Sequence, residues 1–163
     1  MSDDKKCAEL VAGRFAAREN DFKTAWEFFD EYESASEGEQ IALKVVSRNK
    51  GDDLAEYDDF FDWVNAYVLS WDYVEPFTFK GQKTGYYRLQ LSYGGPSDEF
   101  RIYTDGDNAI EEIEYWYLDW YDGASVPVLS TSSSWDVCDW FLDVAPLKAE
   151  KTASSLYLRE CPR

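Results

Sequence analysis

The stretch YRLQLSYGGPSDEFRIYTDGDNAIEEIEYWYLDWY, residues 87–121, decides the fold class of this chain. Its first segment alternates apolar and polar side chains, and the apolar ones are Tyr87, Leu89, Leu91 and Tyr93. Alternation with a period of two is typical of a β-strand that is buried on one face only. The middle of the chain is therefore predicted to form a sheet.

Two clusters of turn residues divide this stretch into three strands. Residues 94–98 are GGPSD and residues 105–108 are DGDN, and both are rich in the residue types that tight turns require. They predict a second strand at residues 99–104 and a third at about residues 110–121, so the sheet is an antiparallel meander. Aromatic residues occupy both faces of the third strand, and we therefore expect that strand to be central and covered on both sides.

The part of the chain before the sheet, residues 1–68, is predicted to be mainly helical. Its apolar residues recur three or four positions apart, the spacing of one helix face. Four segments have this spacing: residues 7–15, 22–29, 41–46 and 52–67. A polar break near Glu19-Asn20 separates the first two segments, and the sequence NKGD at residues 49–52 separates the last two.

The remaining segments complete a prediction for the whole chain. Residues 69–121 form the antiparallel sheet, which gains a strand between Val68 and Phe79. Ser132 to Ser134 can cap a helix at residues 134–144, and residues 148–163 are a polar tail. We therefore expect one α+β domain over residues 1–163, with N-terminal helices packed on an antiparallel β-meander and a short C-terminal helix.

The negative charge of the chain is concentrated in one stretch. The formal net charge is −17, and residues 51–143 contain 20 Asp and Glu against 4 Lys and Arg. Charge that is confined to one part of a chain can produce a directed field, whereas evenly spread charge mainly keeps a protein soluble. Because aromatic residues make up 18% of the chain, it can also build a core and is not an acidic disordered tail.

The composition argues against most familiar kinds of catalysis. The chain has no histidine, which excludes Ser-His-Asp and Cys-His nucleophile systems within it. No phosphate-binding glycine loop occurs, and the acidic turn at residues 105–108 has its glycine in the wrong place for a calcium loop. Cys7, Cys138 and Cys161 are too widely spaced to indicate zinc or a disulfide framework, and Cys138 is expected to pack as a small hydrophobe. We expect no cofactor, no metal and no enzymatic activity.

Two predicted helices place carboxylates around a tryptophan. On the helix at residues 52–67 the acidic face consists of Asp52, Glu56, Asp58, Asp59 and Asp62, with Trp63 among them. On the helix at residues 134–144 it consists of Asp136, Asp139 and Asp143, with Trp140 among them. Like charges at these spacings destabilise an isolated helix, so their repetition indicates selection for a binding surface. The indole would anchor a partner, and the acids would steer it.

The spacing of these carboxylates also suggests what they could imitate. Acids four residues apart lie about 6 Å apart along a helix axis, on the scale of the phosphate spacing of duplex DNA. Glu112 and Glu114, at the start of the third strand, are expected to extend the patch.

In charge, size and lack of catalytic residues, the chain resembles the acidic DNA-mimic proteins of phages and plasmids. Those proteins block restriction enzymes, CRISPR complexes and other DNA-binding machines by occupying the nucleic-acid site. The resemblance implies an inhibitor whose partner is a basic nucleic-acid-binding protein or complex. Direct binding of nucleic acid is not expected, because the charge of the chain would repel it.

Two alternatives remain open at this stage. An immunity protein that neutralises a basic nuclease toxin would use a similar acidic interface. A protein of another class, a carbohydrate-binding or carbohydrate-active protein, could use Trp63, Trp116, Trp120 or Trp140 as stacking platforms beside paired carboxylates. A concave aromatic groove would favour this second alternative.

The location expected from the sequence is the cytoplasm. The first residues, MSDDKKCAEL, lack the apolar core of a signal peptide, and no run of about 18 apolar residues occurs. No membrane association is expected.

Overall fold

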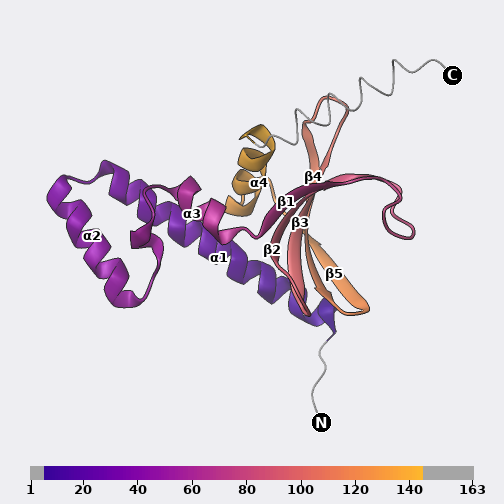
Figure 1. The fold of residues 1–163 in the computed structure, drawn as a ribbon, viewed down its shortest axis with the longest axis horizontal. Helices are drawn as coiled ribbons and strands as arrows, with labels where there is room; N and C mark the ends of the chain where they lie inside the picture. The colour runs from indigo at the N-terminus through magenta and orange to yellow at the C-terminus, as the bar shows by residue number, and fades with distance from the viewer. Residues whose placement is uncertain (1–5, 145–163) are drawn as a thin grey trace, which may run out of the picture.

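The computed structural model describes residues 6–144 and has two layers, a sheet and a set of helices that cover one of its faces (Figure 1). The sheet has five antiparallel strands in the order β1-β2-β3-β4-β5, so each strand pairs with its neighbours in the chain. This arrangement confirms the predicted α+β fold, with N-terminal helices, a meander and a short C-terminal helix. In the described part of the chain, no helix is both long enough and apolar enough to cross a membrane.

The helices and strands have the following bounds. The helices are α1 (Cys7–Ser34), α2 (Glu37–Lys50), the 3-10 turn η1 (Leu54–Glu56), α3 (Phe60–Tyr67) and α4 (Ser133–Val144). The strands are β1 (Ser70–Val74), β2 (Tyr86–Ser92), β3 (Ser97–Thr104), β4 (Ile110–Asp119) and β5 (Asp122–Pro127). The predicted polar tail at residues 148–163 and Cys161 lie outside the described residues.

The core lies between the sheet and helix α1. Leu89 pairs with Phe100, and Phe100 pairs with Tyr115, so three adjacent strands place fully buried side chains in one row. Phe22 of α1 packs on this row, with its ring centroid 6.2 Å from that of Phe100. Burial of each such aromatic ring stabilises the fold by roughly 2–3 kcal/mol.

Helix α1 is one continuous helix of 28 residues, and the predicted break near Glu19-Asn20 is wrong. The polar residues that suggested a break make tertiary contacts instead. Arg18 pairs with Asp98 of β3, and Glu19 accepts hydrogen bonds from the backbone N–H groups of Ser133 and Ser134 at the start of α4. Polar residues in the middle of α1 therefore fix the sheet and α4 to it.

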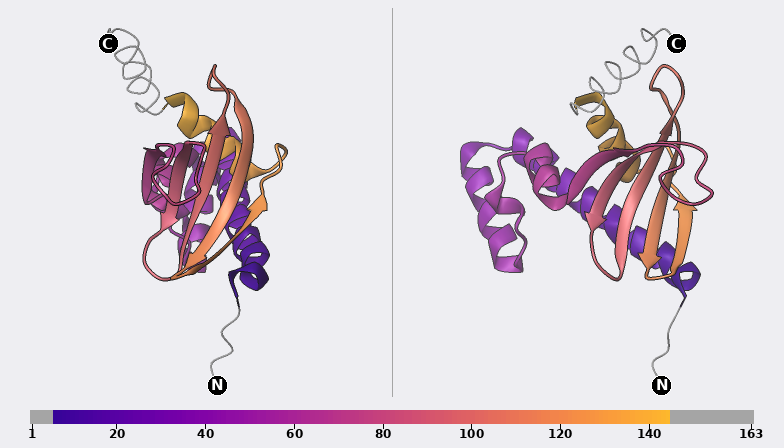
Figure 2. Two further views of the ribbon diagram at one scale, coloured as in Figure 1. Left: turned by 90° about the vertical axis from the view of Figure 1, so that its right-hand side faces the viewer. Right: turned by 45° about the vertical axis from the view of Figure 1, so that its right-hand side comes forward.

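Helix α2 projects from the rest of the molecule (Figure 2). It begins with a capping box, in which Ser36 and Glu39 bond each other's backbone and side chains, and it ends as predicted before Gly51. Gly51 adopts the left-handed conformation, with a φ of 78°, which glycine reaches without strain.

The helix predicted at residues 52–67 is wrong in its first half. Residues 54–56 form the 3-10 turn η1, the chain is extended at Tyr57, and α3 begins only at Phe60. Asp59 is the N-cap of α3, because its side chain accepts a hydrogen bond from the backbone N–H of Asp62 at 2.8 Å. Asp52, Glu56 and Asp59 therefore do not share one helix face.

The sheet departs from its prediction in two respects. Its last strand, β5, was not expected, since the sequence DGASVP at residues 122–127 lacks large apolar residues. Strand β4 is covered on one face only: Ile113, Tyr115 and Tyr117 are buried against the helices, whereas Trp116 and Leu118 line an open groove on the other face. The predicted strand between Val68 and Phe79 is confirmed as β1.

Helix α4 agrees with its prediction. Val137, Cys138, Phe141 and Leu142 are buried, and Asp136, Asp139 and Asp143 are exposed. The Ser132 hydroxyl accepts a hydrogen bond from the backbone N–H of Trp135, as expected of a capping serine.

Candidate functional site

Four aromatic rings form a continuous line across helices α1, α3 and α4. Trp26 of α1 meets Phe60 edge to face at 5.0 Å, Phe60 meets Phe61 at 5.3 Å, and Phe61 stacks on Trp140 of α4 at 4.5 Å. Both tryptophans and Phe61 are at least partly accessible, and Phe60 is buried beneath them. We call this line, with the carboxylates beside it, the acidic–aromatic strip.

The strip contains a pocket of about 190 Å³ between α1 and α3. Its apolar wall includes Trp26, whose side chain is 50% exposed. Three carboxylates also line it: those of Asp30, Glu33 and Asp59. Asp30 and Glu33 form no ion pair with any residue in the range 6–144, so their charges face solvent. An apolar surface with unpaired carboxylates at its edge can bind a cationic side chain by cation–π contact and charge together.

More acids flank both ends of the strip. Those on the α3 side are Asp52, Glu56, Asp58 and Asp62, and those on α4 are Asp136, Asp139 and Asp143, all of them exposed. Segment 52–67 and α4 contain no Lys or Arg. The stacking of Phe61 on Trp140 brings α3 and α4 together, whereas the first half of the predicted segment, around η1, packs on α2.

Trp63, however, is not the exposed anchor that the sequence suggested. Its side chain is only 5% exposed and packs against Phe22 and Tyr67, with ring centroids 6.2 and 4.8 Å away. The cause is the late start of α3, which turns Phe60, Trp63 and Val64 together towards α1. Trp140 keeps a half-buried position, and Trp26, which the sequence grouped with core residues, is the most exposed indole of the strip.

Glu112 and Glu114 do not belong to this surface. They alternate on β4 with Ile113 and Tyr115, which face the helices, so their side chains lie on the opposite face of the sheet. Glu114 accepts a hydrogen bond from the indole N–H of Trp116 at 2.6 Å. The twelve residues predicted to form one surface are therefore divided between two faces.

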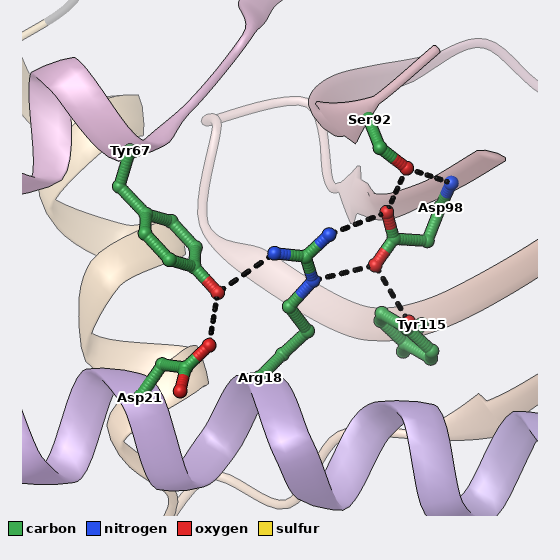
Figure 3. A network of polar contacts seen from close by, with 6 residues as sticks. All are labelled: Arg18, Asp21, Tyr67, Ser92, Asp98 and Tyr115. Atoms are coloured by element: carbon green, nitrogen blue, oxygen red, sulfur yellow. Dashed lines mark hydrogen bonds and ion pairs between the residues drawn. The ribbon is translucent and has the colours of Figure 1, made fainter. Parts of the chain in front are cut away.

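A partly buried polar network joins α1 to the sheet and α3 (Figure 3). Arg18 donates two hydrogen bonds to Asp98, at 2.7 and 2.9 Å, and a third to the Tyr67 hydroxyl at 2.8 Å. Tyr67 in turn donates to Asp21 at 2.6 Å, and Asp98 also accepts from Tyr115 and Ser92. Each oxygen of the Asp98 carboxylate thus has two donors.

The network keeps Asp98 ionised. Burial alone would raise the pKa of this carboxyl, but hydrogen bonds from Arg18, Ser92 and Tyr115 outweigh burial and lower the pKa below 3.8. Burial, with the charge of Asp98, raises the pKa of the Tyr115 phenol. A carboxylate held by four donors stabilises the fold and is poorly suited to accept a proton from a substrate.

A second surface feature is the open face of the sheet, where a groove of about 950 Å³ runs over β2, β3 and β4. At its centre the Arg101 guanidinium lies between two rings, 4.1 Å from the centroid of Trp116 and 4.9 Å from that of Tyr86. Arg101 is also paired with the buried Glu99 at 2.7 Å.

Two turns form one end of this groove. Tyr93, next to the Gly94-Gly95-Pro96 turn, is 84% exposed, and Trp120, between β4 and β5, is 86% exposed. The indole of Trp120 lies over Gly95, where an added Cβ would be 3.1 Å from its Nε1. Trp120 has a φ of 49°, a left-handed conformation that is rare for a bulky residue.

The thiols and carboxylates suggest no metal centre in the described part of the chain. No group of three or more such side chains there is arranged to hold an ion. Cys7 and Cys138 are buried and unpaired, and burial raises the pKa of both thiols. The prediction that Cys138 packs as a small hydrophobe is confirmed.

Comparison of the chain with protein-family models, with curated proteins and with solved structures found no match in any of the three. Its function is therefore argued from its own surfaces.

Proposed function

We propose that the protein binds the basic surface of a nucleic-acid-binding protein through the acidic–aromatic strip and thereby inhibits it. The observation that carries this proposal is the pocket at Trp26, where a half-exposed indole is bordered by the carboxylates of Asp30, Glu33 and Asp59. Tryptophan is enriched among the residues that dominate binding energy, and surrounding charges increase the association rate and select the partner.

The strip combines the two contributions that such an inhibitor needs. The carboxylates of segment 52–62 and α4 produce a negative field with no basic residue on either element. Charge alone gives weak binding at physiological salt, because it is screened beyond about 8 Å. Trp26, Phe61 and Trp140 add apolar area that can be buried, which salt does not weaken.

The test is competition with DNA in a panel of restriction endonucleases and CRISPR effector complexes. The protein should form a complex with at least one member and displace its DNA. Raising the salt concentration from about 0.05 to 0.2 M should weaken the complex about ten-fold or more. A panel in which no member forms a salt-sensitive complex would overturn the proposal.

Matched variants locate the interface. Trp26→Ala should weaken the complex by about 2 kcal/mol, and the control Trp120→Ala, which removes an indole from the other face, should leave it unchanged. The double variant D30K/E33K should abolish binding, whereas E111K/E112K, with the same change in net charge, should change the affinity only slightly. Equal losses of affinity in the two double variants would mean that net charge alone drives association with the partner.

An immunity protein against a basic nuclease toxin would use the same strip. Toxin nucleases therefore belong in the panel, and a complex with one of them that blocks its active site would favour that alternative.

A further inference from the structure

We propose that the groove on the open face of the sheet is a binding site for a neutral oligosaccharide. This site is separate from the acidic–aromatic strip, because the side chains of each strand alternate between the two faces of the sheet. The inference does not depend on the proposed inhibitor function.

The first argument is the shape and the wall of the groove. Its volume of about 950 Å³ is at the upper end of the range for small-molecule sites, and it is open along its length. Trp116, Tyr103 and Leu118 line the floor, and Phe79, Tyr93 and Trp120 line the rim. Arg101 covers one face of Trp116, and the exposed rings of the rim, Phe79, Tyr93 and Trp120, offer flat aromatic surfaces that suit the apolar C–H faces of sugar rings.

The second argument is the charge of the groove. Its two arginines are already paired, Arg101 with Glu99 at 2.7 Å and Arg88 with Asp72 at 2.7 Å. The pairs provide donors and acceptors for ligand hydroxyl groups while adding no net charge. The remaining cation in the lining is Lys80, which disfavours a cationic ligand, and the net charge of −17 on the whole chain repels polyanions such as nucleic acids.

The third argument is a hydroxyl group that lacks a partner. Tyr86 lines the groove below Arg101, and its hydroxyl is buried without a hydrogen bond to any described residue. A buried hydroxyl without a partner lowers the stability of the folded protein. A ligand hydroxyl that forms a hydrogen bond with it would restore this free energy.

The fourth argument is the backbone of Trp120. Its left-handed conformation holds an 86% exposed indole over Gly95 at the end of the groove. Trp120 and Tyr121 are the two central residues of the hairpin turn between Asp119 and Asp122, and such a turn requires a positive φ at its first central residue. The turn does not require a tryptophan, and this indole is not part of the core, so its apolar surface is available to a ligand.

The experiment is a titration of the full-length protein with neutral tetra- to hexasaccharides of glucose, xylose, mannose and N-acetylglucosamine. Tryptophan fluorescence and calorimetry should show saturable binding to at least one of them, with a Kd below about 1 mM. Trp120→Ala should weaken this binding about 3- to 10-fold. Tyr121→Ala, the matched control, removes a neighbouring exposed ring outside the groove lining and should have less than about a two-fold effect.

A conservative variant separates binding from folding. Tyr86→Phe removes the unpartnered hydroxyl, so it should weaken the oligosaccharide about five-fold without lowering the Tm. Absence of saturable binding to every member of the panel would overturn the inference, as would equal losses in the Trp120 and Tyr121 variants. Trp26→Ala should leave oligosaccharide binding intact, so failure of this inference and failure of the proposed inhibitor function are distinguishable.

Discussion

Asp98 is the residue on which the contact between α1 and the sheet most depends. Its carboxylate is almost completely buried and accepts hydrogen bonds from Arg18, Ser92 and Tyr115, three residues from three different elements. Removal of one partner from such a pair leaves a buried charge without compensation.

Asp98→Ala is expected to lower the free energy of unfolding by about 3 kcal/mol, because Arg18 loses its counter-charge inside the protein. Asp72→Ala is the matched control, since the Arg88–Asp72 pair has the same 2.7 Å separation but an Asp side chain that is 42% exposed. The Asp72→Ala variant should lower the free energy of unfolding by less than about 1 kcal/mol. Urea unfolding measures the free energy of unfolding of both variants. Equal losses in the two variants would contradict the expectation that the buried pair matters more than the exposed one.

The pH dependence of stability provides a separate test of Asp98. Its pKa in the folded protein lies below the ordinary 3.8, so its contribution is fully present above pH 3.8 and is lost as pH falls through the folded value. The stability advantage of the native protein over Asp98→Asn should therefore be constant near neutral pH. It should shrink below about pH 3.8, as followed by urea unfolding at several pH values, and an advantage that grows with acidity would contradict the assignment.

At the scale of elements, helix α4 depends on a residue that is distant in the chain. The carboxylate of Glu19 accepts hydrogen bonds from the N–H groups of Ser133 and Ser134 at 2.8 and 2.9 Å, which caps the N-terminus of α4 from outside. The acidic face of α4 is therefore positioned by α1.

Glu19→Ala should destabilise the protein by about 1–2 kcal/mol and increase hydrogen exchange in α4 more than in the sheet. Glu27→Ala, on the exposed part of the same helix, should change stability by less than about 0.5 kcal/mol. Uniform acceleration of exchange over the whole molecule in the Glu19 variant would mean that its effect is not local to α4.

Local patterns predicted the elements that depend on local contacts. The alternation of Tyr87, Leu89 and Leu91 and the turns after it gave the meander, and the apolar stripe of α4 gave its buried face. Tertiary contacts decided the rest. The polar residues near Glu19-Asn20 looked like a helix break, because the partners of Arg18 and Glu19 lie 49 or more residues away in the chain.

The same reason explains what was missed in the candidate sites. The position of Trp63 depends on where α3 begins, which is decided by the capping of Asp59 rather than by the helical period. Trp26 belongs to an apolar spacing, and its exposure follows only from how α3 packs on α1. Nothing in the sequence of β4 distinguishes a strand covered on both faces from one whose second aromatic face lines a groove.

At the scale of the whole molecule, two acidic elements lack basic residues of their own. The four basic residues within residues 51–143 are Lys80, Lys83, Arg88 and Arg101, all on the β1–β2 loop or the open sheet face. The acids of segment 52–62 and α4 have no such neighbours on their own elements. Helices α1 and α2 also carry basic residues, so repulsion among like charges opposes folding most on segment 52–62 and α4, which have none.

An increase of NaCl from about 0.05 to 0.5 M should accordingly raise the Tm by a few degrees, because salt screens this repulsion. The variant D30K/E33K should have a higher Tm at low salt and a smaller response. Differential scanning calorimetry measures both, and a Tm that falls with added NaCl would show that attractive ion pairs dominate instead.

The contacts of α1 also affect when the protein can fold during translation. Helix α1 precedes the other described elements in the chain, and several of its partners come much later: Asp98 for Arg18, Asp122 for the Cys7 backbone and Ser133 for Glu19. During translation the buried side of α1 gains its partners in stages: Trp63 and Tyr67 of α3 and Phe100 of β3 reach Phe22 first, and β5 and α4 follow. The buried side of α1 should therefore be completely covered only after α4 has been synthesised, and nascent chains that end before residue 133 should bind chaperones more strongly than chains that include α4.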